Sequence, residues 1–307
     1  MAPRLTVAIC TWNRCELLRQ TLERMTGLSV PAGLDWELVV VNNRSTDGTD
    51  AVLAAFESRL PLRRLFEPAS GQSNARNTAV REARGEYIVW TDDDVLVDSG
   101  WLSAYAAAFE RWPQAGFFGG PIEPWFEGQP PAWLRAGIRR VEAAYAVLDL
   151  GSEPVRLSAR TFPYGANMAV RRKVYESVRY DPGLGLRPGS SMRSEEKALV
   201  EHLARAGADG WWVPGARVTH FVPRARQTVS YLRGYYFGWG EYLGRGAGPT
   251  GRALLGRPLW LWRELVESEA RYRVWRAVGK PERWLDELKT ASTAWGRFRW
   301  YAAGFSP

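Results

Sequence analysis

Short apolar runs alternate with stretches of helical periodicity along the first hundred residues. The run at 36–41 is apolar apart from Glu37, which is typical of a parallel strand buried on both faces. Between such runs, apolar residues recur every three or four positions, so that Leu18 and Leu22 share one helical face. The pattern predicts an α/β fold of βαβ units with a parallel sheet and right-handed crossovers. The predicted strands are 4–10, 36–41, 62–68 and 86–90, and the predicted helices are 14–28, 45–60 and 71–85.

The regular alternation of predicted strands and helices ends after residue 94. A stretch rich in proline and glycine, 121–160, interrupts the regular elements, and the pattern from 228 onward is helical with a break at 244–258. We therefore expect one α/β domain over 1–223 and a helical region over 224–307. The other predicted elements are strands at 115–125 and 210–222, helices at 101–112, near 134–147 and at 194–207, and a strand turning into a helix over 166–178.

Positive charge and tryptophan concentrate near the C-terminus. Residues 224–307 carry 15 Lys/Arg against 7 Asp/Glu, a surplus equal to the +8 of the whole chain, and 7 of the 16 tryptophans. Residues 1–223 are therefore balanced in charge. Three interpretations of the basic region stay open, namely a membrane-surface element, an interface of a homodimer, or helices packed on the first domain.

Composition argues against several classes of protein. No apolar run approaches the roughly 20 residues that cross a bilayer, and the N-terminus enters a strand pattern without the layout of a signal peptide. The only cysteines, Cys10 and Cys15, have no metal-ligand spacing. We expect a reducing, cytoplasmic setting, with the inner face of the membrane as a contact for the basic region.

Three consecutive carboxylates, Asp92, Asp93 and Asp94, follow the strand predicted at 86–90. Adjacent like charges repel, so a cation is expected among them. Hard divalent ions such as Mg²⁺ and Mn²⁺ bind carboxylate oxygens and share phosphate oxygens of a substrate. A solvated acidic turn that caps the next helix is the alternative. Ligands of open α/β sheets bind at the carboxyl ends of strands, where further polar loops are predicted at 10–14, 42–48 and 71–76.

Four segments in this order resemble the family 2 glycosyltransferases with the GT-A fold. They are VAICTWNR at 7–14, ELVVVNNRSTDGT at 37–49, GQSNARNTAV at 71–80 and GEYIVWTDDD at 85–94. Each motif alone is weak, and all four at family spacing are specific. The resemblance is strong over residues 4–100 and looser over 160–222. It implies a Rossmann-like, mostly parallel sheet flanked by helices, with nucleotide binding in 1–100, acceptor binding in 101–223 and a helical C-terminal extension.

The resemblance also implies a reaction. Members of the family transfer a sugar from a nucleotide-diphosphate donor, most often a UDP-sugar, to an acceptor hydroxyl with inversion. The Q-x-x-R-W motif and membrane helices of the processive members do not occur in this sequence, so transfer of a single sugar is expected. The expected acceptor is a saccharide, a lipid-linked compound or another hydroxyl compound, in the synthesis of envelope polysaccharide, glycolipid or another glycoconjugate.

Matching positions assign the donor site. Trp12 would stack on the base, Asn43 would hydrogen-bond it, and Arg76 would contact the diphosphate. The family commonly has Asp where Asn43 stands, which leaves the base open because an amide both donates and accepts. A core tryptophan and a surface arginine are the alternatives for Trp12 and Arg76. The nucleotide-binding residues predicted in this way are Thr11, Trp12, Asn13, Arg14, Asn43, Arg76, Asp92 and Asp93.

The same matching assigns the metal site. Asp94 would be the direct ligand of Mn²⁺ or Mg²⁺, and Asp92 would lie on the metal or ribose side. His220, at the end of a predicted strand, is a candidate third ligand because a histidine completes the site in several GT-A enzymes. A structural histidine is the alternative.

Two glutamates are candidates for the catalytic base that an inverting transfer requires. Glu196 stands at the family's position and Glu195 precedes it, where the family has a Glu-Asp pair. Both could instead be first-turn acids favoured by the helix dipole. On the acceptor side, Gly165 and Asn167 match a family loop.

Two other functions compete with this interpretation. A nucleotidyltransferase of related architecture would open with a glycine-rich loop after the first strand, and residues 10–16 contain no glycine. A protein that binds nucleic acid or another anionic surface through its basic region is the non-enzymatic alternative. The acidic loop would repel nucleic-acid phosphates without a metal, so we expect no nucleic-acid partner.

Overall fold

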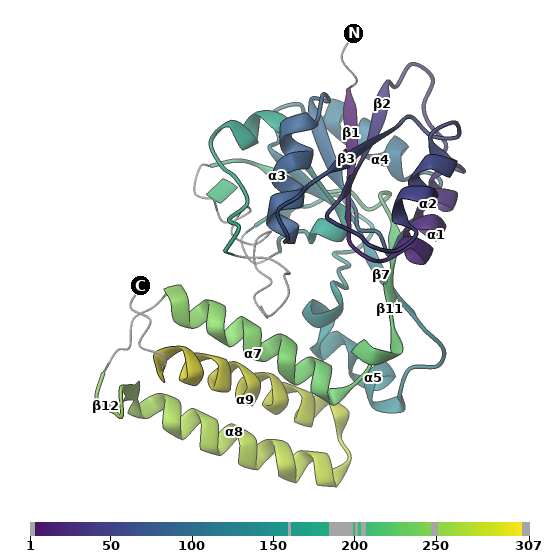
Figure 1. The fold of residues 1–307 in the computed structure, drawn as a ribbon. Helices are drawn as coiled ribbons and strands as arrows, with labels where there is room; N and C mark the ends of the chain where they lie inside the picture. The colour runs from purple at the N-terminus through teal and green to yellow at the C-terminus, as the bar shows by residue number, and fades with distance from the viewer. Residues whose placement is uncertain are drawn as a thin grey trace. The chain divides into compact units, whose positions relative to one another are not determined.

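The computed structural model describes residues 4–158, 161–183, 199, 202–203, 207–246 and 251–302 (Figure 1). The chain forms two compact units. The first unit comprises the described residues within 1–125, 146–188 and 195–221. The second unit comprises the described residues within 126–145 and 222–307, so it takes a segment from the middle of the chain as well as the C-terminal region.

An eight-stranded sheet forms the centre of the first unit, in the order β3-β2-β1-β4-β9-β6-β10-β8. Six of its strands run parallel to one another, while β9 and β8 are antiparallel to their neighbours. This confirms the predicted α/β fold with a mostly parallel sheet. The strands are β1 Leu5–Thr11, β2 Trp36–Asn42, β3 Leu62–Phe66, β4 Tyr87–Trp90, β6 Phe117–Gly119, β8 Arg156–Leu157, β9 Met168–Arg171 and β10 Gly210–Trp212.

Helices cover both faces of this sheet. In β1, Val7 and Ile9 pack in one core cluster, and Ala8 packs in the other because side chains alternate along a strand. The first cluster includes α1 (Cys15–Met25), α2 (Thr49–Phe56) and α4 (Trp101–Arg111). The second includes α3 (Gln72–Glu82). Burial on both faces explains why β1 and β2 are mostly apolar along their length.

A smaller sheet of three strands extends from the acidic loop. Its order is β5-β11-β7, with β5 at Val95–Val97, β11 at Val218–Val222 and β7 at Ile122–Phe126. Strands β5 and β11 are antiparallel and pair His220 with Val95. Strand β5 begins directly after Asp94, so this pairing brings a late segment of the chain to the acidic loop.

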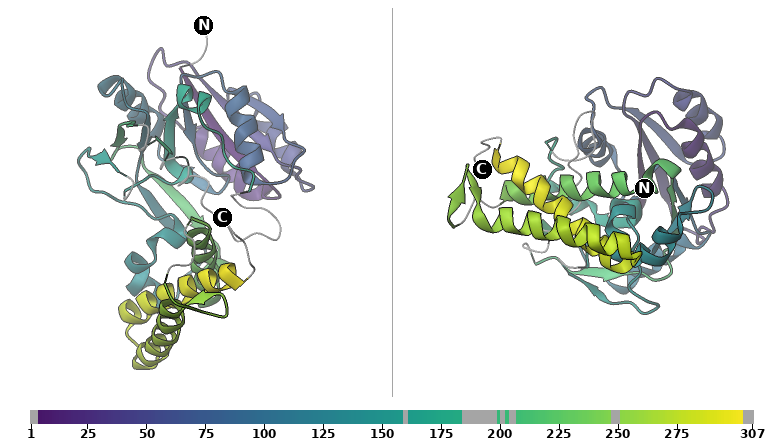
Figure 2. Two further views of the ribbon diagram at one scale, coloured as in Figure 1. Left: turned by 90° about the vertical axis from the view of Figure 1, so that its left-hand side faces the viewer. Right: turned by 90° about the horizontal axis from the view of Figure 1, so that it is seen from below.

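The second unit is mainly helical. Helices α7 (Val229–Gly246), α8 (Leu259–Val278) and α9 (Pro281–Ala302) lie side by side, with α9 in contact with both others (Figures 1 and 2). Between α7 and α8 lies a small hairpin of β12 (Ala253–Leu254) and β13 (Arg257–Pro258). The predicted break at 244–258 thus contains a hairpin, although α7 continues to Gly246. The unit also contains α5 (Ala132–Gly137), η1 (Ile138–Arg140), η2 (Glu142–Tyr145) and η5 (Arg224–Arg226).

Two glycines allow the close approach of α7 and α9. A Cβ atom added to Gly240 would lie 2.1 Å from the carbonyl oxygen of Thr293, and one added to Gly296 would lie 2.0 Å from that of Phe237. Any larger side chain would force the helix backbones apart. In the sequence these glycines resemble helix breakers, but here they serve helix packing.

Some predicted elements differ in the structure. The single helix expected near 134–147 is α5 followed by two short 3-10 segments, η1 and η2. The helix expected after the strand at β9 is a 3-10 segment, η4 (Arg172–Glu176). Another 3-10 segment, η3 (Gly165–Asn167), precedes β9. Most of the helix predicted at 194–207 lies outside the described residues.

Candidate functional site

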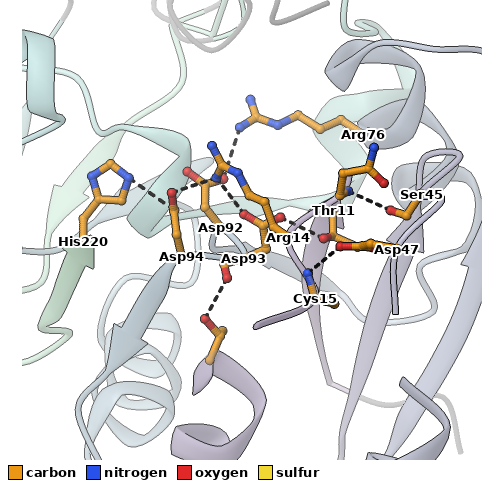
Figure 3. A network of polar contacts seen from close by, with 12 residues as sticks. Thr11, Arg14, Cys15, Ser45, Asp47, Arg76, Asp92, Asp93, Asp94 and His220 are labelled. Atoms are coloured by element: carbon orange, nitrogen blue, oxygen red, sulfur yellow. Dashed lines mark hydrogen bonds and ion pairs between the residues drawn. The ribbon is translucent and has the colours of Figure 1, made fainter. Parts of the chain in front are cut away.

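The acidic loop follows β4 at the carboxyl edge of the parallel strands. Asp93 and Asp94 are buried, and Asp92 is half-buried. The side chains of all three gather with those of Arg14 and His220 (Figure 3). A buried carboxylate is costly unless a positive charge or a hydrogen-bond donor lies close to it. Such groups must therefore surround the three adjacent carboxylates.

Asp93 is anchored to the protein from several directions. Its Oδ2 accepts a hydrogen bond from Thr11 Oγ1 at 2.8 Å, and its Oδ1 lies 2.9 Å from Arg14 Nη1. The hydroxyl of Thr21 donates to its backbone oxygen at 3.1 Å. Burial raises the pKa of Asp93 to about 6, against the opposing effect of Arg14 and with help from the neighbouring Asp94. Asp93 thus ties the acidic loop to β1 and α1.

Arg14 joins the acidic loop to the loop that follows β1. Its Nη1 also lies 2.7 Å from Asp94 Oδ2, so one nitrogen bridges two carboxylates. Burial alone would lower the pKa of this guanidinium, but the carboxylates of Asp93 and Asp94 outweigh burial and raise it. Arg14 therefore holds a permanent positive charge against the loop.

Asp92, Asp94 and His220 form a cluster whose composition suits a metal ion. One potential ligand atom from each lies within 4.8 Å of the others. His220 Nε2 lies 3.3 Å from Asp94 Oδ1, and the backbone N–H of Phe221 donates to the carbonyl of Asp94 at 2.9 Å. Two carboxylates and an imidazole are donors that Mn²⁺ accepts well, and Mg²⁺ takes the carboxylates readily. The sequence-predicted trio is therefore brought together, and it fits a divalent cation.

Cationic side chains also lie against the acidic loop. Among the described residues, the guanidinium groups of Arg14 and Arg76 face its three carboxylates. Arg76 Nη2 lies 3.9 Å from Asp92 Oδ1. Its guanidinium also packs against the rings of Trp90 and Tyr180, 5.7 and 5.3 Å from their centres. Arg76 is buried, so the alternative of a surface arginine is wrong.

The loop after β1 presents an aromatic side chain. Trp12 is 51% exposed, which excludes a core tryptophan. Asn13 has a positive φ of 53°. Its backbone N–H donates to Ser45 Oγ at 3.0 Å, and its Oδ1 accepts from the N–H of Thr46 at 2.7 Å. Asn13 therefore positions the loop and leaves the face of Trp12 accessible.

Asp47 is a positioning residue that the sequence motifs did not single out. Its carboxylate accepts hydrogen bonds from the N–H of Cys15 at 2.9 Å and from the N–H of Thr49 at 3.1 Å. It therefore stabilises the first turns of α1 and α2 together. The helix predicted at 45–60 begins with Ser-Thr-Asp, residue types that often cap a helix, but only the fold reveals the link to α1.

Asn43 makes three hydrogen bonds within the protein through its side-chain amide. Its Nδ2 donates to the carbonyls of Glu67 and Ala69 at 3.0 and 2.7 Å, and its Oδ1 accepts from the N–H of Gly71 at 2.9 Å. These bonds shape the loop between β3 and α3. The predicted contact of Asn43 with the base stays a prediction, and its geometry favours a role in loop positioning.

Asn167 is a second internal hub. It is fully buried, and its Oδ1 accepts from Trp101 Nε1 and Tyr105 Oη, both at 2.8 Å. Its Nδ2 donates to the carbonyls of Pro121 and Ala216 at 3.0 and 2.6 Å. These four bonds fill the capacity of the amide. The predicted acceptor contact of Asn167 stays a prediction, and its geometry supports a structural role.

Three predicted site residues remain, of which one lies in the described part of the chain and two lie outside it. Gly165 is buried in η3, directly before β9. The candidate bases Glu195 and Glu196 lie outside the described residues.

Comparison with known proteins is consistent with this geometry. Residues 6–179, more than half of the chain, match the family model described as Glycosyl transferase family 2. The succinoglycan biosynthesis protein ExoM of Rhizobium meliloti (strain 1021) is 26% identical over 245 residues, which cover 78% of this chain and 74% of that protein.

Solved structures share the fold. The mannosyltransferase PcManGT from Pyrobaculum calidifontis, in complex with GDP-Man and Mn²⁺, aligns with a TM-score of 0.62 at 20% identity, over 97% of this chain and 88% of that one. TarS 1–349 of S. aureus, in complex with UDP, aligns with a TM-score of 0.57 at 15% identity, over 96% and 91%. These likenesses support the GT-A fold expected from the sequence motifs.

Proposed function

This chain belongs to glycosyl transferase family 2 and is a glycosyltransferase, and from that premise we propose that it transfers a single sugar from a nucleotide-diphosphate sugar to an acceptor hydroxyl with inversion, using a divalent cation. The observation that carries the proposal is the cluster of Asp92, Asp94 and His220 at the carboxyl edge of the sheet, whose potential ligand atoms lie within 4.8 Å of one another.

The cluster would hold Mn²⁺ or Mg²⁺. When bound there, a divalent cation supplies Lewis-acid stabilisation of the charge on the leaving diphosphate. Arg76 supplies a buried positive charge next to Asp92 and would contact the same diphosphate. Arg14 and Thr11 hold Asp93, which keeps the loop in place for both groups.

The base would stack on the exposed ring of Trp12, next to the loop positioned by Asn13. We propose a UDP-sugar as the donor, following the family resemblance. Two structural relatives were solved with different nucleotides, GDP-Man and UDP, so the base is the first property to test.

Deprotonation of the acceptor hydroxyl is assigned to Glu196, with Glu195 as the second candidate. This assignment rests on the resemblance alone, because an inverting transfer needs a general base and these acids match its position. For the acceptor we propose a saccharide or lipid-linked saccharide of an envelope polysaccharide, which the name of the Rhizobium relative supports. Contact of the C-terminal region with a membrane is part of the same proposal, and a homodimer stays a prediction.

The test is a thermal stability screen. A ligand that binds only the folded protein raises its melting temperature. Nucleoside diphosphates and nucleotide sugars of each base would be added with Mn²⁺, with Mg²⁺ and with EDTA. We expect metal-dependent stabilisation by one nucleotide, lost in Asp94→Asn and kept in the control Asp35→Asn, whose exposed side chain precedes β2 at the opposite sheet edge. Stabilisation by no nucleotide, or equal stabilisation in EDTA, would overturn the proposal.

A further inference from the structure

The hairpin of β12 and β13 lies at one end of the helical unit, next to the start of α8 (Figures 1 and 2). Leu254 pairs with Arg257, so Leu255 and Gly256 form a two-residue turn. Both have a positive φ, 50° and 73°, as a type I′ turn requires. Asn-Gly is the common sequence of such a turn, because leucine is disfavoured in the left-handed region. The leucine at this turn therefore has no explanation in the hairpin itself.

The apolar side chains at this end of the unit face solvent. Leu255 is 74% exposed and Leu254 is 52% exposed. Leu259 and Trp260, at the first turn of α8, are 46% and 41% exposed. Single exposed apolar residues are ordinary on protein surfaces, but a contiguous group of them marks an interaction site.

Arginines flank this group in the sequence, and the first acidic residue after it is Glu264. From Arg245 to Arg263 the sequence contains four arginines and no Asp or Glu, and the other two are Arg252 and Arg257. Arg263 is paired with Glu267 at 2.6 Å, so the positive charge nearest the turn comes from Arg252 and Arg257. A third cation reaches the group from α9, since the guanidinium carbon of Arg297 lies 5.8 Å from the ring centre of Trp260.

We propose that residues 252–260, the hairpin and the start of α8, bind the surface of an anionic phospholipid bilayer. The leucines and Trp260 enter the headgroup layer, and the arginines contact the lipid phosphates. The charge favours this partner over a second copy of the chain, because two arginine-flanked tips would repel each other. None of the helices in the described ranges is long and apolar enough to span a membrane.

The experiment is vesicle flotation of the full chain. Vesicles of phosphatidylcholine alone are compared with vesicles that also contain phosphatidylglycerol, at low and high salt. We expect binding to the anionic vesicles only. High salt should weaken this binding, because it screens the attraction between the arginines and the anionic lipids. Leu255→Asn should lower the bound-to-free ratio about tenfold, as expected for the loss of one buried leucine. Arg252→Gln should lower it about fivefold.

The variants separate binding from folding. Asparagine is favoured in a type I′ turn, so Leu255→Asn removes the apolar tip without breaking the hairpin. The matched control is Val274→Asn, which changes an exposed valine near the other end of α8 and should bind as the wild type does. Equal losses in Leu255→Asn and Val274→Asn would overturn the proposal, as would absence of binding to anionic vesicles.

Sedimentation velocity tests whether a second copy of the chain binds this surface instead. A wild-type dimer that Leu255→Asn converts to a monomer would assign the surface to a second copy and overturn the lipid proposal. The inference rests on the membrane contact in the proposed function. The vesicle assay needs neither donor nor metal, so its failure would remove that contact and leave the transfer reaction to its own test. Asp94→Asn should float with anionic vesicles as the wild type does.

Discussion

The two ends of the central parallel strands carry polar networks that differ in composition. At the amino ends, Glu37 Oε1 accepts hydrogen bonds from Thr6 Oγ1 at 2.7 Å and from the N–H of Arg84 at 2.8 Å. Its Oε2 lies 2.6 Å from Arg63 Nη1. The guanidinium of Arg63 also lies 3.9 Å from Glu82 Oε2, and Glu82 Oε1 lies 3.2 Å from Arg81 Nε, so two carboxylates meet two guanidinium groups among the described residues.

At the carboxyl ends, three adjacent carboxylates meet two guanidinium groups and a histidine. The difference teaches how to separate a structural network from a binding site in the same sheet. Both ends are buried and hydrogen-bonded, so burial alone does not distinguish them. The arrangement of donor atoms does, because atoms of Asp92, Asp94 and His220 that could bind a metal ion lie within 4.8 Å of one another at the carboxyl ends.

The largest effect is expected at the carboxyl end. Asp94→Asn removes a predicted metal ligand, and a cation at a leaving diphosphate contributes several kcal/mol to the transition state, so the transfer rate should fall about a thousandfold. Release of nucleoside diphosphate from the donor found in the thermal screen measures the transfer rate. Titration with Mn²⁺ measures the affinity of the site for the metal. The folded protein should be at least as stable as the wild type, because a like charge is removed. Unchanged Mn²⁺ binding would contradict the assignment.

The amino end should respond in stability instead. Glu37→Gln removes the nearer and more buried of the two carboxylate partners of Arg63 and should lower the free energy of unfolding by about 2–3 kcal/mol at neutral pH. Nucleotide binding should persist. Urea denaturation measures the first quantity, and the nucleotide screen measures the second. Loss of nucleotide binding in the folded variant would show that the two networks are not separate.

The pH dependence of that stability has a definite sign. Burial would raise the pKa of Glu37, but the hydrogen bonds from Arg63, Arg84 and Thr6 lower it below its ordinary value. A lowered folded-state pKa contributes stability above the pKa of an unfolded glutamate, about 4.3, and that contribution is lost as pH falls through the folded pKa. The gap between wild type and Glu37→Gln should therefore be full at neutral pH and narrow below about pH 4.

A smaller effect is expected for Trp12→Ala. Stacking of a base on an aromatic ring is worth about 1–3 kcal/mol, so nucleotide affinity should fall at least fivefold. Trp12→Phe should keep most of the affinity. Calorimetric titration measures both, and the melting temperature should change little because Trp12 is half exposed. Equal affinity in Trp12→Ala would place the base elsewhere.

The smallest effect is expected at the exposed ion pair of Arg4 and Glu110, whose atoms lie 3.0 Å apart. Solvent screens this pair, so Glu110→Gln should change the free energy of unfolding by about 0.5 kcal/mol or less. Urea denaturation measures this change, which should be far smaller than the change in Glu37→Gln. A loss as large as that of Glu37→Gln would show that charge pairing at the amino end depends little on burial.

Much of the fold and the acidic site follows from local sequence. The alternation of apolar runs and helical periods predicts β1 to β4 and α1 to α3, because burial on a strand or helix face repeats with the period of that element. The three adjacent aspartates, together with the family motifs, predict a cation site. The position of these residues at strand ends is also local, since a polar run must leave the buried sheet.

What the sequence could not determine is which partner each polar side chain meets. Asn43 and Asn167 match binding positions of the family, yet both use their amides on backbone and side chains far away in the chain. His220 reaches Asp94 only because β11 pairs with β5. The glycines of α7 and α9 pack helices that they would weaken in isolation. Periodicity is a property of neighbours in sequence, whereas hydrogen-bond partners and close contacts are set by neighbours in space, and the tertiary structure alone chooses those.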